Sequence, residues 1–390
     1  MTLTARIFNA LMPLVSILLA SIFFACSSNL PANKVRMYVG TYTGKGSDGI
    51  YLFQFDTATC EVLPKGLAVR TENPSFLTVD HTGRFLYAVN EIDSFNGEAS
   101  GAISAFAIDQ ETGMLTRLQQ VSSLGSGPAH LSLDREGRYL LAANYGGGSV
   151  AVYPVESDGR LGERTAFMQA HGSSVNRARQ SSPHAHFVQV SPDNREAFVA
   201  DLGIDKVLVY DFDGASGALK ADSAKFRSLD PGAGPRHVAF GASGKDVYVV
   251  NELNSTVTHF AYDARRGNLE KRETVSTLAT NMLGTNSTAE NIIDREGRWL
   301  YVSNRGDDSI VQFDIDPESG NLKLVDRVPC GGQSPRHITF DPSGRWLISS
   351  NQKSNTITMF QVNARDGRLT EFSKHLELFS PVCVVFAVGR

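Results

Sequence analysis

Short segments in which apolar and polar side chains alternate recur along most of this 390-residue chain. In residues 298–303, for example, aromatic and β-branched residues follow a period of two, which is typical of a half-buried β-strand and not of a helix. Turn-forming segments with Asp and Gly, such as residues 211–217 and 314–320, lie between such strands. The pattern therefore predicts an all-β protein built from short strands.

The strands recur in one repeated unit. In the clearest copy, an apolar strand begins at Pro235, a turn contains Gly244, a second strand ends at Asn251, and a third strand covers residues 256–260. The residue that ends the second strand marks each copy, and these marker residues are Asn90, Asn144, Asp201, Asn251, Asn304 and Asn351. A spacing of about 50 residues with several strands per unit indicates a propeller or a solenoid.

The two ends of the repeat array complete each other. Residues 37–41 match the second strand of a unit and residues 50–55 match the third, but the first strand is missing there. Residues 380–386 read as a first strand with no second strand after it. Pairing these segments closes a ring and removes the exposed sheet edges of an open array. We therefore predict a closed seven-bladed β-propeller over residues 37–390.

Residues 1–26 have the pattern of an export signal, with a basic start, an apolar run and small residues at the end. The end resembles a bacterial lipoprotein processing site in which Cys26 becomes acylated, although Phe23 stands where Leu is usual. An uncleaved membrane anchor is the alternative, but the run is barely long enough to span a bilayer and contains Pro13. We expect an exported protein of the periplasm or cell envelope, with residues 27–36 as a linker.

Composition narrows the classes of partner. A net charge of −4 with 20% charged residues provides no basic field, so we expect no nucleic-acid partner. Beyond Cys26, the cysteines are Cys60, Cys330 and Cys383; this odd set without short spacings argues against a disulfide framework or a zinc site, while one bridge stays possible. The sequence has no phosphate loop or other cofactor motif, and we expect a monomer without cofactor or metal.

The repeat also predicts where a site can form. The first and second strands of each unit make an antiparallel hairpin, so the start of the first and the end of the second meet at one end of the ring. Three repeat positions should surround this end: Ser75, Ala129, His186, Arg236, Ala289 and Arg336; then Phe76, His130, Phe187, His237, Glu290 and His337; then, after each marker, Glu91, Tyr145, Leu202, Glu252, Arg305 and Gln352.

The histidines divide into two kinds. His130, His237 and His337 share one repeat position, which favours a hydrogen-bonded framework role. His186 instead falls at the position of Arg236, and His184 lies on the same side of an extended segment. An imidazole beside arginines is a candidate acid or base, and a satisfied polar pair in the core is the alternative.

Two arginines and a glutamate converge at the same end. Arg236 and Arg305 are suited to hold a carboxylate or phosphate, because a planar guanidinium binds two oxygens at once. Glu252 follows its marker in the same unit as Arg236, so the two residues could form a structural ion pair. If Glu252 is instead partly free, it could orient water or accept a proton.

Several motifs together resemble the seven-bladed propeller lactonases, which include bacterial 6-phosphogluconolactonase and fungal carboxymuconate cyclase. The resemblance covers about residues 35–390 and rests on segments 37–43, 183–186, 234–237, 250–252 and 301–306. It implies catalytic roles for His186, Arg236, Glu252 and Arg305. His184, Glu91, Glu290 and Arg336 are further substrate-binding candidates.

The function expected from this resemblance is hydrolysis of a small anionic sugar or organic-acid lactone, or the formation of a lactone by a cycloisomerase. The export signal conflicts with a phosphorylated cytoplasmic sugar as substrate, which favours a different lactone. The alternative from another class is a non-catalytic envelope-anchored propeller that binds a protein or a glycan, because repeat architectures commonly serve as binding platforms.

Overall fold

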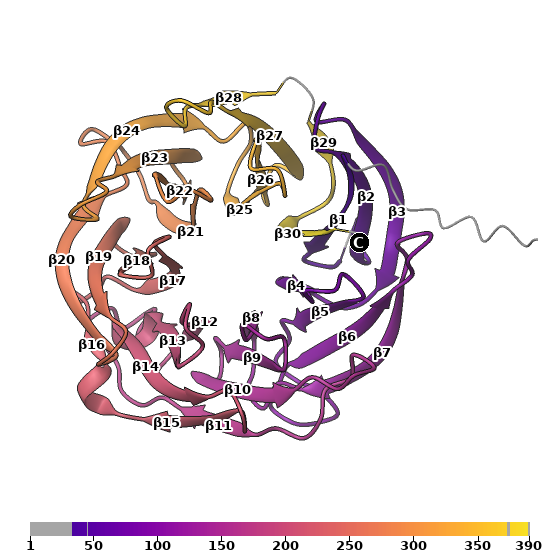
Figure 1. Cartoon of the computed structure of the whole chain (residues 1–390), viewed down its shortest axis with the longest axis horizontal. Helices are drawn as coiled ribbons and strands as arrows, with labels where there is room; N and C mark the ends of the chain where they lie inside the picture. The colour runs from indigo at the N-terminus through magenta and orange to yellow at the C-terminus, as the bar shows by residue number, and fades with distance from the viewer. Residues whose placement is uncertain (1–32, 45, 373–374, 389–390) are drawn as a thin grey trace, which may run out of the picture.

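The computed structural model describes residues 33–44, 46–372 and 375–388, and these form a ring of seven four-stranded antiparallel blades (Figure 1). The predicted all-β propeller is confirmed. The segment 1–26 and most of the predicted linker lie outside the described residues. The first strand begins at Lys34, inside the segment predicted as a linker.

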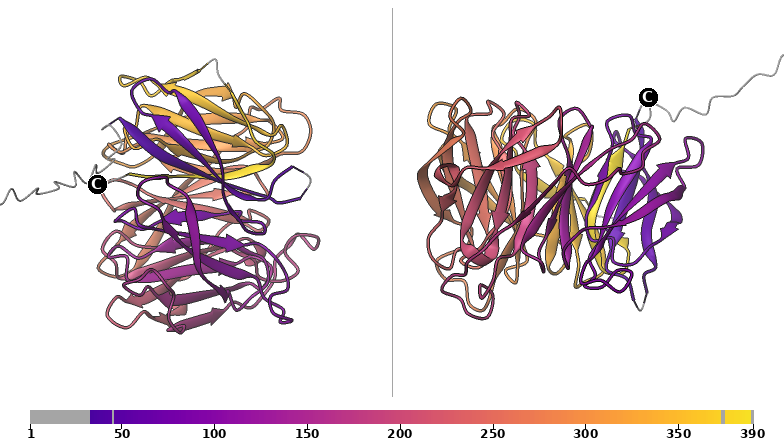
Figure 2. Two further views of the ribbon diagram at one scale, coloured as in Figure 1. Left: turned by 90° about the vertical axis from the view of Figure 1, so that its right-hand side faces the viewer. Right: turned by 90° about the horizontal axis from the view of Figure 1, so that it is seen from below.

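Each blade runs from an inner strand beside the ring axis to an outer strand at the rim (Figures 1 and 2). In this order the first four blades after the N-terminal segment are β30 (Pro381–Ala387), β1 (Lys34–Thr41), β2 (Gly49–Asp56) and β3 (Val62–Arg70); β4 (Leu77–Val79), β5 (Phe85–Asn90), β6 (Ala102–Ile108) and β7 (Leu115–Ser122); β8 (Pro128–Leu133), β9 (Tyr139–Asn144), β10 (Ser149–Pro154) and β11 (Ala166–Gln169); and β12 (Ala185–Val190), β13 (Glu196–Asp201), β14 (Lys206–Asp213) and β15 (Ala218–Ala221).

The remaining three blades are β17 (Pro235–Phe240), β18 (Asp246–Asn251), β19 (Thr256–Asp263) and β20 (Asn268–Ser276); β21 (Ser287–Ile293), β22 (Trp299–Arg305), β23 (Ser309–Ile315) and β24 (Leu322–Pro329); and β25 (Pro335–Phe340), β26 (Trp346–Asn351), β27 (Thr356–Val362) and β28 (Leu369–Glu371). Short strands β16 (Arg227–Ser228) and β29 (Leu376–Glu377) add to β14 and β27. Two 3-10 turns, Leu202–Ile204 and Ser223–Lys225, complete the regular elements of the described residues.

The termini close the ring as predicted. β30 pairs antiparallel with β1, so that Met37 faces Phe386 and Val39 faces Val384. One blade therefore takes its inner strand from the end of the chain and its other three strands from the beginning. In the described part of the chain, no helix is long and apolar enough to cross a bilayer.

Apolar residues fill the spaces between neighbouring blades. Phe198 and Val209 of one blade, for example, pack with Val247 and Phe260 of the next. A repeated tyrosine also ties blades together: the hydroxyls of Tyr38, Tyr87, Tyr248 and Tyr301 donate to the carbonyls of Gly113, Gly159, Gly320 and Gly367, respectively, each in the outer turn of the adjacent blade. The cysteines Cys60, Cys330 and Cys383 are buried and free, so they form no disulfide bridge.

The marker residues are part of this framework. All six are buried, and the amides of Asn144, Asn304 and Asn351 each donate to the backbone carbonyl of a preceding loop. Each marker ends the second strand of its blade at the face of the ring where the inner strands begin. We call this face, with the residues that follow the markers, the mouth.

Candidate active site

A bulge at the start of the inner strand aims two consecutive side chains toward the ring axis. In β17, Pro235 faces Asn251 and His237 faces Val250, so Arg236 is the extra residue between them. Two residues opposite one form a β-bulge, which bends the strand and redirects a side chain. The same shift occurs in β8, β12 and β25. His186 and Arg336 therefore occupy the position of Arg236 in their blades, as the repeat predicted.

A second local feature fixes the residue that follows the marker. Gly234 has a φ of +66°, a left-handed conformation that favours glycine, and its carbonyl accepts the Glu252 backbone N–H at 2.7 Å. The carbonyl of Gly127 accepts the Tyr145 backbone N–H in the same way. This bond holds Glu252 beside the bulged Arg236.

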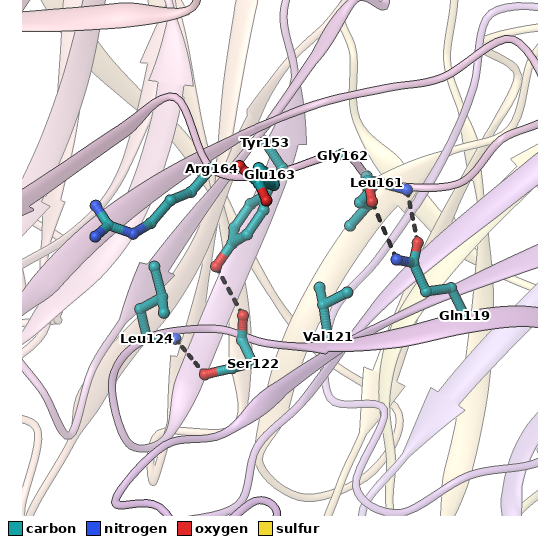
Figure 3. Close-up of a pocket in the computed structure, with 9 residues that line it drawn as sticks. All are labelled: Gln119, Val121, Ser122, Leu124, Tyr153, Leu161, Gly162, Glu163 and Arg164. Atoms are coloured by element: carbon teal, nitrogen blue, oxygen red, sulfur yellow. Dashed lines mark hydrogen bonds between the residues drawn. The ribbon is translucent and has the colours of Figure 1, made fainter.

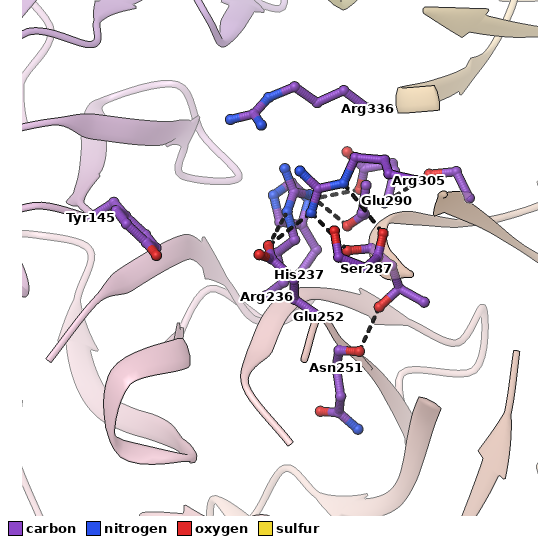
Figure 4. A network of polar contacts seen from close by, with 12 residues as sticks. Tyr145, Arg236, His237, Asn251, Glu252, Ser287, Glu290, Arg305 and Arg336 are labelled. Carbon is purple, nitrogen blue, oxygen red and sulfur yellow. Dashed lines mark hydrogen bonds and ion pairs between the residues drawn. The ribbon is translucent and has the colours of Figure 1, made fainter. Parts of the chain in front are cut away.

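Glu252 is the centre of an ion-pair cluster, and Figure 4 shows it beside Arg236 and Arg305. Its Oε2 lies 2.9 Å from Arg305 Nη2 and 3.3 Å from Arg236 Nε, and its Oε1 accepts a hydrogen bond from Arg179 Nη2 at 2.7 Å. The contact with Arg236 is an ion pair without hydrogen-bond alignment at Nε. Arg236 and Glu252 thus form an ion pair, which was one of the two alternatives from the sequence. Arg305 and Arg179 contact the same carboxylate.

Three guanidinium groups around one carboxylate leave excess positive charge. Burial disfavours ionisation of Glu252, yet Arg305, Arg236 and Arg179 lower its pKa to about 2. For Arg236, burial and repulsion from Arg305 and Arg336 lower the pKa to about 9. Glu252 is therefore a firmly ionised clamp and a weak base, while the arginines are under-neutralised and suited to an additional anion.

Arg336 forms a second group on the mouth. Its Nη2 donates to the Tyr42 hydroxyl at 2.7 Å, and that hydroxyl donates to Glu91 Oε2, also at 2.7 Å. Arg336 itself lies 4.0 Å from Glu91. Burial is the main cause that raises the pKa of Tyr42, so this phenol stays protonated. The predicted residues Arg336 and Glu91 are therefore joined through a tyrosine.

His184 and His186 have different surroundings. His184 Nδ1 donates to the Tyr145 carbonyl at 2.8 Å, and its ring stacks on Tyr145 with the centroids 4.6 Å apart. His186 is 5% exposed, and its Nδ1 is buried without a hydrogen-bond partner. Burial and the charge of Arg236 hold the pKa of His186 well below its usual range. His186 is therefore a neutral imidazole at neutral pH, with one buried ring nitrogen that no protein group satisfies.

Side chains close the channel beneath the arginines. Phe76 contacts His130, His237 and His337 with ring centroids 4.2, 6.0 and 5.8 Å apart, so residues of separate blades meet across the axis. Glu290 belongs to this layer, where its Oε1 lies 2.7 Å from His237 Nδ1. The predicted substrate-binding residue Glu290 is therefore buried below the mouth and paired with a histidine.

A separate cavity of about 830 Å³ lies at the rim between β7 and the segment after β10 (Figure 3). It is lined by Gln119, Ser122, Tyr153, Leu161 and Arg164, among others, and the Tyr153 hydroxyl donates to the Ser122 carbonyl at 2.7 Å. None of the predicted site residues lines it. Within the described ranges, no group of three or more His, Cys, Asp or Glu side chains is arranged to hold a metal ion.

Comparison with known proteins identifies the family. Residues 36–386 match the model of the family described as lactonase, 7-bladed beta-propeller. The chain belongs to this family. It is 34% identical over 349 residues to a 6-phosphogluconolactonase of Bacillus subtilis, covering 90% of this chain and 97% of that protein. A 6-phosphogluconolactonase of Formosa agariphila is 33% identical over 312 residues, covering 78% of this chain and 86% of that protein.

A solved structure agrees with this assignment. The periplasmic gluconolactonase of Pseudomonas aeruginosa is 35% identical, with a TM-score of 0.84, and the match covers 91% of this chain and 99% of that one. Other relatives, such as a Lactococcus lactis protein that is 33% identical, are described only as uncharacterised. These relatives support a lactonase-type function for this propeller.

The structure of this lactonase-family propeller adds three residues to the predicted site. Tyr42 follows Thr41, which takes the marker position in the shared blade, so extending the repeat count across the termini would have found it. Tyr145 was counted at the mouth, but its partners His184 and Arg179 become apparent only in three dimensions. Arg179 comes from the loop 170–184, which has no counterpart in the repeat and therefore gave no signal.

Proposed function

We propose that this protein hydrolyses small lactones of sugars or organic acids that carry a negative charge. The observation that carries the proposal is the set of three guanidinium groups sharing Glu252, next to a neutral His186 with an unpartnered nitrogen. Arg236 and Arg305 are the buried donors of this set, and such cationic donors stabilise the oxyanion that forms when water attacks a carbonyl. The lactonase relatives support the same class of reaction.

In the proposed reaction, His186 takes a proton from water while the water oxygen bonds to the lactone carbonyl carbon. Arg236 and Arg305 donate hydrogen bonds to the carbonyl oxygen as it becomes an oxyanion. The ring C–O bond then breaks, and His186 gives the proton on Nε2 to the leaving ring oxygen. The product is the open hydroxy acid. Glu252 is not the base in this scheme, because Arg179, Arg236 and Arg305 engage both of its oxygens; it holds the arginines in place.

We assign the charged group of the substrate to the edge of the mouth formed by Arg336. Its guanidinium contacts a neutral phenol at 2.7 Å and a carboxylate at 4.0 Å, so it keeps capacity for a carboxylate or phosphate. Arg336→Ala should therefore raise KM for charged lactones by about tenfold and leave neutral sugar lactones nearly unaffected.

The test is an initial-rate assay of lactone opening with the purified protein on neutral, carboxylated and phosphorylated sugar lactones. We expect turnover above the spontaneous rate and at least a tenfold loss in His186→Ala, mostly in kcat. Cyclisation of an unsaturated dicarboxylic acid to its lactone should be assayed in parallel, because a lactone-forming cycloisomerase adds the carboxylate across the C=C bond and needs no hydroxy acid. The absence of turnover in both assays would point to a binding propeller.

We also propose that the protein is exported and anchored through Cys26. The apolar run and the residues around Cys26 support this, as does the periplasmic location named for the similar Pseudomonas aeruginosa protein. Cys26→Ala should release the protein from the membrane fraction or leave it unprocessed. Unchanged processing and membrane attachment in this variant would instead indicate a membrane-spanning anchor.

A further inference from the structure

Three histidines share one repeat position, but one of them has a different partner. His130 Nδ1 accepts the backbone N–H of Val188, and His337 Nδ1 accepts that of Val384, each at 3.4 Å from the inner strand of the next blade. His237 Nδ1 instead lies 2.7 Å from Glu290 Oε1. The repeat therefore uses this position twice for a bond between blades and once for a histidine–carboxylate pair.

The ring nitrogen of His237 that points away from Glu290 has no protein partner. His237 Nε2 and His186 Nδ1 are both buried without hydrogen-bond partners, and the centroids of the two rings lie 5.2 Å apart. Buried polar atoms in native proteins normally have partners, and an ordered water molecule is a common one. A water molecule within hydrogen-bond distance of both nitrogens is the partner that we assign to them in the proposal below.

We propose that Glu290 and His237 form a buried dyad that sets the tautomer of His186 and takes up the proton that His186 Nδ1 releases when Nε2 removes one from water. The inference rests on the proposed lactone hydrolysis. Glu290 and His237 do not contact the reacting atoms in this scheme, so both are positioning residues. The arrangement is a carboxylate–histidine pair that orients a second group, which is a general way to fix a histidine tautomer.

The proton steps balance within the chain. At rest, Glu290 is a carboxylate that accepts from His237 Nδ1–H, and His186 carries its proton on Nδ1 with Nε2 bare. As His186 Nε2 takes a proton from the attacking water, its Nδ1 proton passes through the bridging water to His237 Nε2. The His237 Nδ1 proton moves to Glu290, which becomes a carboxylic acid. The steps reverse when the ring oxygen of the substrate is protonated.

The surroundings of the dyad favour a transiently protonated Glu290. Burial is the main cause that raises the pKa of Glu290 and lowers that of His237, so both groups resist a net charge. A neutral carboxylic acid beside a neutral imidazole is therefore an accessible state. The titratable and charged groups that face the pair from the surrounding strands are Arg236, His130, His186, His337, Arg305 and Arg336.

The test compares Glu290→Gln and His237→Phe with His130→Phe in the full-length protein. Phe is a matched replacement because Phe76 and Phe187 occupy this position in other blades. We expect Glu290→Gln and His237→Phe to lower kcat at least tenfold with KM changed less than twofold, and to shift the acid limb of the kcat–pH profile. His130→Phe should keep kcat and the pH profile within twofold of wild type.

A second readout does not depend on turnover. Nitrogen-15 NMR of labelled histidine rings reports which nitrogen of His186 carries the proton. We expect the Nδ1–H form in the wild type at pH 8 and a shift toward Nε2–H in Glu290→Gln or when the wild type is acidified. The acid titration of the wild type gives the answer even if a variant fails to fold.

The outcomes separate the dyad from the proposed function. Active wild type with unchanged kcat, pH profile and His186 tautomer in Glu290→Gln overturns the dyad and leaves lactone hydrolysis standing. A tautomer shift in a wild type without any lactone turnover supports the coupling and overturns the function. An equal loss of kcat in His130→Phe would show that the channel layer acts only as packing, which also overturns the dyad.

Discussion

The two faces of the ring satisfy their charges in opposite ways. On the face away from the mouth, the turn between the first and second strands binds a carboxylate through its own backbone: Asp134 accepts the backbone N–H groups of Arg138 and Tyr139 at 2.6 and 2.8 Å. Asp294 makes the equivalent bonds to Arg298 and Trp299 at 2.6 and 2.7 Å. At the mouth, Glu252 instead takes its partners from another blade and from a loop.

This difference separates scaffold from site. A carboxylate bound by the backbone N–H groups of its own turn stabilises that turn and can recur in every blade. A carboxylate shared by guanidinium groups from separate blades has no counterpart elsewhere in the repeat, and its burial is costly unless the geometry is maintained. We therefore expect substitutions on the far face to lower the free energy of unfolding without lowering turnover per folded molecule. Substitutions at the mouth should also lower the turnover of molecules that remain folded.

The largest effect should follow the removal of a strand that reaches both faces. Deleting residues 380–390 removes β30, which pairs with β1 along its length and begins at the mouth. The deletion exposes the edge of β1 and opens the ring. We expect aggregation or loss of the cooperative thermal transition in calorimetry. A deletion variant that stays monomeric with an unchanged melting temperature would contradict closure by the termini.

The next effect should come from Glu252→Gln. It leaves three guanidinium groups without their counter-charge, so we expect the free energy of unfolding to fall by about 3–5 kcal/mol at pH 7 and kcat/KM to fall about 100-fold at temperatures where the variant is folded. Denaturant titration and lactone kinetics on the same preparation measure both.

The pH dependence of that loss has a definite sign. The pKa of Glu252 falls from 4.5 to about 2 on folding, so the stability it provides is complete above about pH 4.5 and is lost as the pH falls toward 2. The stability gap between wild type and Glu252→Gln should therefore narrow over this interval. Glu196→Gln is the matched control, because Glu196 is also buried, with Lys225 Nζ at 2.7 Å, but lies away from the mouth. It should destabilise the fold and leave kcat intact.

A smaller effect is expected on the far face. Asp134→Ala removes the backbone bonds from Arg138 and Tyr139, a longer one from Glu136 at 3.3 Å, and the bond from Asn194 Nδ2 at 3.0 Å. At about 1 kcal/mol for each of the three shorter bonds, the free energy of unfolding should fall by about 3 kcal/mol. Turnover per folded molecule should stay within twofold of wild type. A tenfold loss of kcat without a change in melting temperature would mean that the two faces do not differ as described.

The smallest effect concerns the one acidic marker. Asp201 is buried where five other blades have Asn, and burial is the main cause that raises its pKa from 3.8 to about 6. Because the unfolded chain releases this proton earlier, ionised Asp201 lowers stability as the pH rises from about 4 to above 6. Asp201→Asn should gain roughly 1–2 kcal/mol at pH 8 and little at pH 4. An equal change at both values would rule out this cause.

The repeat made the fold predictable to the level of single positions. Because each blade has the same strand order, the marker spacing indicated both the seven blades and the pairing of β1 with β30, and counting back from Asn251 placed Arg236 and His186 at equivalent positions. The same repeat count, extended across the termini, would have identified Tyr42. It would not have placed the start of β1 at Lys34, because the ends of a strand depend on its pairing with β30 and β2.

The chemistry of the site was less predictable because it arises between blades. Sequence position brought Arg236 and Glu252 together, but it could not show that Arg305 and a loop residue, Arg179, complete the cluster. Nor could it show that Glu252 is fully engaged and that His186, the base we propose, is buried with an unpartnered nitrogen. Those properties follow from distances and burial across three blades, which leave no periodic signal in the chain.

The most direct test is a crystal structure of the protein with an unreactive lactam analogue of a sugar lactone. Our account predicts the analogue at the mouth, with its carbonyl oxygen within about 3 Å of a nitrogen of Arg236 or Arg305 and its ring beside His186. Binding in the rim cavity lined by Tyr153 and Leu161, with the mouth empty in an active enzyme, would contradict it.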